Sequence, residues 1–277
     1  MGLFSELKLA VPWGHIAAKA WGSQKGSPIL CLHGWLDNAN SFDRLIPLLP
    51  RDFYYVAMDF GGHGLSSHYS PGLPYYYQNF VGEIRRVSAA LKWDRFSIMG
   101  HSFGGTVGGM FSCMFPEMVD KLILLDSSPF VLDSNELENL LTYKRKVIEH
   151  TLLVEQAAQE PPRALSPEEM LQRLLKNNSH VGEECGELLL QRGATQVPAG
   201  LVLNRDRRIA WVSAAALLPS RACRPLLWRN VHSRVFILFI HFQSTPSISS
   251  ARSCVHTPSR SCRPTCCSSK QLEDFLT

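Results

Sequence analysis

The sequence predicts an α/β protein built on a mostly parallel, doubly wound sheet. Short, continuous apolar runs such as "SPILCLHG" (27–34) and "FYYVAMDFGGHG" (53–64) end in glycine turns, as strands buried on both faces do. Between such runs, "YYYQNFVGEIRRVSAALKW" (75–93) spaces its apolar residues three and four apart, which predicts an amphipathic helix. Strands that alternate with helices in this way indicate parallel strands with helices on both faces of the sheet.

The predicted core occupies residues 1–130. It begins with a hairpin, in which "PWG" turns between "ELKLAV" and "HIAAKAW". "FDRLIPLLP" is a helix candidate, "RFSIMG" and "VDKLILLDSSP" are further buried strands, and "TVGGMFSCMFP" is a helix that Pro116 ends. No internal repeat is visible in this part of the chain.

Residues 131–212 change to a succession of helices with no convincing strand. In "SPEEMLQRLLKNN", Ser166 is the expected N-cap, Pro167 takes the first helical position, and Glu169 completes a capping box. A helical insertion of this size after several strand and helix units suggests a lid over a site. The alternative is a set of ordinary helices packed on the sheet.

Residues 213–277 differ in composition from the rest. The last 64 residues hold eleven serines and five cysteines, and only "SRVFILFIHF" has the pattern of a strand. Such a segment buries too little apolar surface to offset the cost of ordering it, so we expect an atypical, largely disordered tail. We therefore expect the C-terminal strands of the sheet to be missing.

Composition and charge argue against nucleic-acid-binding, membrane-spanning, secreted and metal-binding proteins. The net charge is +4, but residues 214–277 alone carry eight Lys/Arg and two Asp/Glu, so the basic surplus lies in the tail and we expect no nucleic-acid partner. The longest apolar run, "VFILFI", is far too short for a transmembrane segment, and the N-terminus lacks a secretory pattern. We therefore expect an intracellular protein with reduced cysteines. The tail cysteines lack the paired spacing of zinc ligands, so we expect no metal and no cofactor.

"GHSFG" at 100–104 follows an apolar run and precedes a helix candidate, which predicts a nucleophile elbow. A serine on a sharp strand-to-helix turn has a strained backbone, and the residues two positions to either side must lack bulk. Ser102 would then project above the carboxyl ends of the strands, where the N-terminus of the helix stabilises a developing anion. The alternative is a serine in an ordinary glycine-rich turn.

"LHGWLDN", "MDFGGHGLSS" and "GHSFGG", in this order and spacing, resemble the α/β-hydrolase superfamily. Over residues 3–212 the chain resembles the animal serine hydrolase-like proteins, with "KLILLDSSP" and "ELLLQRG" among the shared runs. The resemblance implies a serine hydrolase with an unassigned small-molecule substrate. It also implies a perinuclear or peroxisomal location. The serine at the elbow argues against the related epoxide hydrolases and dehalogenases, whose nucleophile is a carboxylate.

In this fold the oxyanion hole combines the N–H after the nucleophile with one from a loop after an early strand, here Phe103 and Trp35. His33 and His63 are expected to hold loops in place. Asp126, which closes "LILLD", is a candidate triad acid, although a capped turn through the following serines explains it equally well.

No histidine has a convincing context for the triad base. His232, His241 and His256 remain in the tail, and His101 is expected to point away from the hydroxyl. The sequence therefore predicts hydrolysis of an ester-like small molecule through an acyl-serine, impaired if the base is absent. The alternative is an inactive hydrolase-fold protein that keeps its pocket for binding. Neither the substrate nor the oligomeric state is determined.

Overall fold

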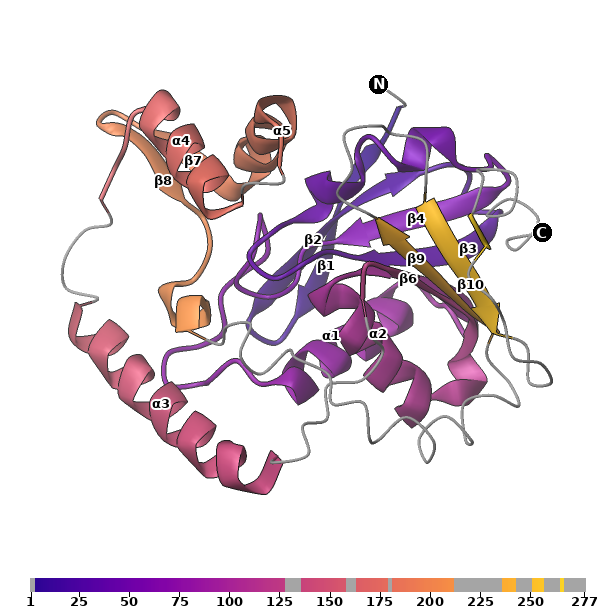
Figure 1. The fold of residues 1–277 in the computed structure, drawn as a ribbon, viewed down its shortest axis with the longest axis horizontal. Coiled ribbons are helices and arrows are strands. Elements are labelled where there is room, and N and C mark those ends of the chain that lie inside the picture. The colour runs from indigo at the N-terminus through magenta and orange to yellow at the C-terminus, as the bar shows by residue number, and fades with distance from the viewer. Residues whose placement is uncertain are drawn as a thin grey trace.

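The computed structural model shows a large α/β core with a smaller group of elements beside it (Figure 1). It describes residues 3–127, 136–157, 163–178, 181–211, 236–242, 251–256 and 265–266.

The core is a nine-stranded sheet in the order β1-β2-β4-β3-β5-β6-β9-β10-β11. Its first six strands by sequence are β1 (Ser5–Val11), β2 (Gly14–Trp21), β3 (Ser27–Leu32), β4 (Phe53–Met58), β5 (Phe96–His101) and β6 (Val119–Leu125). The central strands β4, β3, β5, β6 and β9 run parallel, and the antiparallel pairs lie at the two ends of the sheet. The predicted fold class and the opening hairpin are confirmed.

The central strands are buried on both faces, as their uninterrupted apolar runs predict. Along β3, Leu30 and Leu32 pack into one apolar cluster, whereas Ile29 and Cys31 pack into another. Because successive side chains of a strand point to opposite faces, these two clusters lie on the two sides of the sheet.

Helices cover one face of the sheet, where α1 (Tyr77–Ala90) packs against α2 (Phe103–Met114) (Figure 1). The other face is covered by the segment after β3, which contributes Phe42, Ile46 and Leu49 to its cluster. We expected a helix at "FDRLIPLLP", and this was wrong. The segment forms only two short 3-10 turns, Ala39–Phe42 and Ile46–Leu48, since a proline inside it removes a backbone donor.

The inserted region holds three helices, α3 (Glu136–Ala157), α4 (Pro167–Asn177) and α5 (Glu183–Gly193). The capping box at the start of α4 is present: Glu169 N–H donates to Ser166 Oγ, and the Glu169 carboxylate accepts from Ser166 N–H. None of the helices in the described part of the chain is both long and apolar enough to cross a membrane.

The expectation of no strand in residues 131–212 was wrong. Two short antiparallel strands, β7 (Ala194–Val197) and β8 (Gly200–Leu203), form a hairpin directly after α5. Strands this short carry too little periodicity to distinguish them from a loop. We call the described residues from 163 to 211 the cap. They contain α4, α5, this hairpin and the 3-10 turn η4 (Arg207–Trp211), which packs on α3.

The sheet continues beyond β6. The strand expected in "SRVFILFIHF" is present as β9 (Phe236–Phe242), which pairs in parallel with β6, so the final strands are not all missing. β10 (Ala251–His256) and β11 (Thr265–Cys266) add antiparallel strands at this edge. These segments form strands, whereas the rest of residues 213–277, to which the expectation of a largely disordered tail applies, lies outside the described residues.

Candidate functional site

Ser102 stands between β5 and α2, at the carboxyl end of the central strands. Its φ of 49° and ψ of −116° lie in a region that L-residues rarely adopt. Hydrogen bonds on both sides hold this conformation. Ser102 N–H donates to Leu125 O at 3.0 Å, and Ser102 O accepts from Gly105 N–H at 3.0 Å and from the Ser127 hydroxyl at 2.6 Å. The backbone therefore has the strained turn that the elbow motif predicts.

The glycines on either side of Ser102 are required by contacts with backbone. A Cβ on Gly100 would lie 2.5 Å from Gly105 N, and a Cβ on Gly104 would lie 2.2 Å from Leu32 O. Neither obstacle is a flexible side chain, so neither glycine can be replaced without a shift of backbone. The close approach lets α2 begin directly against the ends of β3 and β5.

The loop after β3 lies against the elbow. A Cβ on Gly34 would lie 3.0 Å from His101 Nδ1, and the Trp35 and Phe103 rings contact each other edge to face, with centroids 4.7 Å apart. The two residues proposed as oxyanion donors are thus brought together next to Ser102. Leu36 in the same loop has a φ of 65°, a second strained position within this site.

The chain is similar in sequence and structure to proteins of the α/β-hydrolase fold. The family model for the alpha/beta hydrolase fold matches residues 27–160. The serine hydrolase-like protein of Mus musculus is 75% identical over 211 residues, which cover 76% of this chain and 68% of that protein. Serine hydrolase-like protein 2 of Homo sapiens is 70% identical over 237 residues, 86% of this chain and 75% of that protein.

The chain belongs to the α/β-hydrolase superfamily. The crystal structure of a hypothetical protein from Pseudomonas aeruginosa PAO1 agrees, with a TM-score of 0.69 and 30% identity over 84% of this chain and 80% of that one. In this superfamily a nucleophile is expected on a turn between a strand and the following helix, and Ser102 lies on such a turn, between β5 and α2.

His33, in the first loop of this α/β-hydrolase chain, holds backbone. It is fully buried, its Nε2 accepts from Phe60 N–H at 3.0 Å, and its Nδ1 lies 2.7 Å from Gly34 O. Burial, reinforced by the nearby His63, holds the pKa of His33 well below its usual range. A neutral ring that accepts at Nε2 and donates from Nδ1 satisfies both contacts, in agreement with a structural role.

His63 is also buried and neutral. Burial lowers its pKa to about 4, and its Nδ1 lies 3.1 Å from Gly61 O. Its ring packs between those of His33 and Trp35, with centroids 5.1 and 5.2 Å away. His63, in the glycine turn after β4, therefore packs against the loop that carries Trp35.

Asp126 follows β6 directly and has a φ of 45°. It is exposed, and its neighbour Ser127 donates to the carbonyl of Ser102, so the turn that carries Asp126 is joined to the elbow. The hydroxyl of Ser127 thus stabilises the turn at Ser102. The role of Asp126 as triad acid stays a prediction.

Several histidines of the hydrolase core have partners away from the nucleophile. His15 Nε2 lies 3.0 Å from Leu65 O, and His68 Nε2 lies 2.7 Å from Asn204 O. His101 Nδ1 faces Asp37 Oδ2 at 3.9 Å. His232 lies outside the described residues, and the side chains of His241 and His256, on β9 and β10, are not described either. The base stays unassigned.

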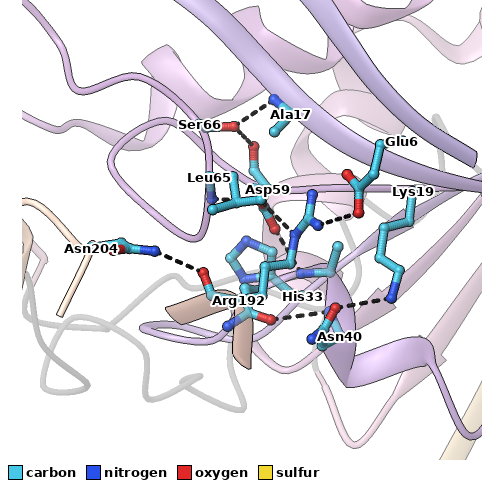
Figure 2. Close-up of polar contacts among 12 residues, drawn as sticks. Glu6, Ala17, Lys19, His33, Asn40, Asp59, Leu65, Ser66, Arg192 and Asn204 are labelled. Atoms are coloured by element: carbon cyan, nitrogen blue, oxygen red, sulfur yellow. Dashed lines mark hydrogen bonds and ion pairs between the residues drawn. The ribbon is translucent and has the colours of Figure 1, made fainter. Parts of the chain in front are cut away.

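A buried ion pair that the sequence analysis did not identify joins the core to the cap (Figure 2). Asp59, fully buried at the end of β4, accepts from Arg192 Nε at 2.8 Å and from the N–H groups of Ala39 and Leu65 at 2.7 and 2.8 Å. Arg192 Nη1 donates to Glu6 at 2.7 Å. Burial still raises the pKa of Asp59, against the lowering effect of Arg192. The sequence signal for this pair is a carboxylate directly after a buried strand, because a buried negative charge needs a positively charged partner.

Amide side chains of the core also bond the backbone of α5. Asn38 Nδ2 donates to Leu189 O at 2.9 Å, and Asn40 Nδ2 donates to Leu188 O at 2.8 Å. These carbonyls precede that of Leu190, which accepts the Ala194 N–H at the end of the helix, so the two amides are additional donors to the side of α5. The segment after the Trp35 loop therefore anchors the cap, and the cap in turn holds that loop in place.

Proposed function

We propose that this chain is a serine hydrolase that cleaves an ester-like small molecule through an acyl-Ser102 intermediate. The strained conformation of Ser102, at the junction of β5 and α2, is the observation that supports this most strongly. Strain of this kind persists where the surrounding structure imposes it, and it is concentrated at functional sites. In the proposed reaction the hydroxyl oxygen attacks the ester carbonyl, the alcohol leaves, and water then hydrolyses the acyl-enzyme.

Charge stabilisation is assigned to backbone donors. The N–H groups of Trp35 and Phe103 are proposed to bind the oxyanion, and the N-terminus of α2 adds favourable electrostatic potential. Asp126 is proposed as the acid that orients the base. The proposal needs no metal, and no group of three potential ligands capable of holding one lies among the described residues.

A fluorophosphonate probe, which labels activated serines covalently, tests the proposal. We expect wild-type protein to be labelled and Ser102→Ala to lose the label completely, as measured by intact mass. Ser88→Ala is the matched control, since Ser88 donates only within α1, to Arg85 O at 3.0 Å. Absence of labelling in folded wild-type protein would contradict the nucleophile assignment.

A binding protein without catalysis is the second candidate. It is favoured by the partners of His15, His33, His63 and His68, which engage these rings elsewhere. Loss of the base from a catalytic triad lowers turnover by about a million-fold, so such a protein would have almost no activity. An experimental structure with a histidine Nε2 within about 3.2 Å of Ser102 Oγ would exclude this alternative.

A further inference from the structure

β1 forms one end of the nine-stranded sheet, where β2 is its neighbour on one side (Figure 1). The two strands pair without interruption from Val11 opposite Gly14 to Ser5 opposite Ala20. Among the residues that the structure describes, none bonds to the backbone of β1 on its other side. A regular strand with a free edge can pair with a further strand, so the side chains along it decide what it accepts.

The hydrogen bonds of β2 show which residues of β1 face the free edge. Ala17, opposite Lys8, donates its N–H to Ser66 Oγ at 2.8 Å, and its carbonyl accepts from Asp59 N–H at 2.8 Å. In an antiparallel pair of this kind both residues direct their backbone groups away from each other, so those of Lys8 face the open side. Residues alternate in this respect, so those two positions to either side of Lys8 also face outward, and those between bond to β2.

The side chains along this edge are accessible. Leu3 and Phe4, which lead into the strand, are 98% and 42% exposed. Within β1, Leu7 is half-buried against the core, whereas the charged side chains of Glu6 and Lys8 on either side of it are exposed. The edge thus combines accessible apolar side chains with one negative and one positive charge, two residues apart.

This arrangement of charges is complementary to itself. Two identical edges pair antiparallel about a two-fold axis, and only registers in which outward-facing residues meet can form the hydrogen bonds. A register centred on Lys8 places two lysines opposite each other, and one centred on Glu6 does the same with two glutamates, which is unfavourable. A register centred on Leu7 places Glu6 of each chain opposite Lys8 of the other, and the two copies of Leu7 meet at the axis.

We propose that this chain associates with a second copy of itself through β1, in the antiparallel register centred on Leu7. This register aligns the outward N–H and C=O groups of both strands and forms a Glu6–Lys8 ion pair on each side of the axis. It also places the exposed Leu3 of each chain beside Val11 of the other. A lysine on a sheet edge ordinarily prevents pairing, but here the nearby glutamate makes it a determinant of register.

Glu6 can serve both the cap and the second copy. Its Oε1 accepts from Arg192 Nη1 at 2.7 Å, while its side chain stays 49% exposed. Lys8 has no ion-pair partner among the described residues of its own chain. Association through β1 therefore supplies the charge of Lys8 with a partner, and it takes place next to the ion pair that attaches α5 to the core.

Disulfide cross-linking of the full chain tests the register. The two Leu7 Cα atoms at the axis form a pair without hydrogen bonds, in which such atoms lie about 4.5 Å apart, within the range of a disulfide. We expect Leu7→Cys to form a covalent dimer under mild oxidation. Leu9→Cys is the matched control, because Leu9 also packs on the core but its two copies are separated by roughly 13 Å along the strands. Its yield should be at least about ten-fold lower, with the wild-type chain as the background from native cysteines.

Charge reversal tests the ion pairs. Lys8→Glu and Glu6→Lys each place like charges opposite each other, so each should raise the dissociation constant of the dimer about ten-fold or more in analytical ultracentrifugation. An equimolar mixture of the two variants brings opposite charges together again and should recover the dimer. Recovery on mixing is not expected of variants that have lost their fold.

A wild-type chain that stays monomeric at micromolar concentration would overturn the inference. So would a failure of Leu7→Cys to form the covalent dimer, equal yields from Leu7→Cys and Leu9→Cys, or no recovery in the mixture of charge variants. A disulfide from Leu7→Cys to a native cysteine of the same chain would overturn it as well, because another segment of the chain would then cover the edge.

Discussion

Ser102 has a strained backbone at the position of the proposed nucleophile. A non-glycine residue at φ 49° and ψ −116° costs on the order of 1–3 kcal/mol, a cost that glycine largely avoids. We therefore expect Ser102→Gly to raise the free energy of unfolding by about 1 kcal/mol while it abolishes labelling by fluorophosphonate. Urea denaturation measures the first effect. A loss of stability in Ser102→Gly would show that the Ser102 backbone is not strained.

The buried environment of Glu83 should make the stability of the protein depend on pH. It is fully buried on α1, where Tyr69 donates to its carboxyl group and Gly61 N–H donates to Oε2 at 2.9 Å. Burial raises the pKa of Glu83 from 4.5 to about 7 although these hydrogen bonds lower it. The folded protein thus keeps a proton that the unfolded chain releases, so stability is fully present below pH 4.5 and is lost as the pH rises through 7.

The Glu83→Gln variant isolates this effect. Its amide does not titrate, so between pH 5 and pH 8 the wild-type free energy of unfolding should fall by roughly 2–3 kcal/mol relative to the variant. Urea denaturation at the two pH values gives the difference, and all other titrating groups cancel in the comparison. Parallel pH profiles would mean that Glu83 stays charged in the folded protein.

At the scale of elements, the attachment of α5 to the core depends on Arg192. Removing one partner of a buried ion pair leaves the other charge uncompensated, which costs about 3–5 kcal/mol. Arg192→Met keeps much of the side-chain volume and should destabilise the protein by this amount. Glu6→Gln removes only the half-exposed partner and should cost less than about 1 kcal/mol. Equal effects of the two substitutions in thermal denaturation would contradict this assignment.

The stability of the whole molecule depends on the strands that extend the sheet beyond β6. β9 pairs with β6 on one side and with β10 on the other, so a residue at its centre has both neighbours. Phe239→Pro removes one N–H of this ladder and should cost at least about 2 kcal/mol and promote association of the exposed edge. Phe239→Val, which suits a strand, is the control. Unchanged stability and a monodisperse elution profile for Phe239→Pro would show that β9 contributes little to the sheet.

Local pattern was enough to predict much of the fold and the nucleophile. Uninterrupted apolar runs identified β3 to β6, and the glycines around Ser102 identified the elbow, because strand burial and steric clearance act on neighbouring residues. The same reasoning failed at "FDRLIPLLP" and at the β7–β8 hairpin. In the first segment a proline prevents the helix that the apolar spacing suggested. In the second, strands of four residues are too short to show an alternation of apolar and polar residues.

What the sequence by itself determined is therefore the class of fold, the strained Ser102 and the loop that carries Trp35. Tertiary structure alone decided which charges meet. Asp59 and Arg192 are 133 residues apart, and they meet only because the cap folds back on the core, where Asp206 N–H also donates to Gly62 O in the glycine turn. Electrostatic contacts of this range depend on strand order and on the docking of helices, which no local periodicity encodes.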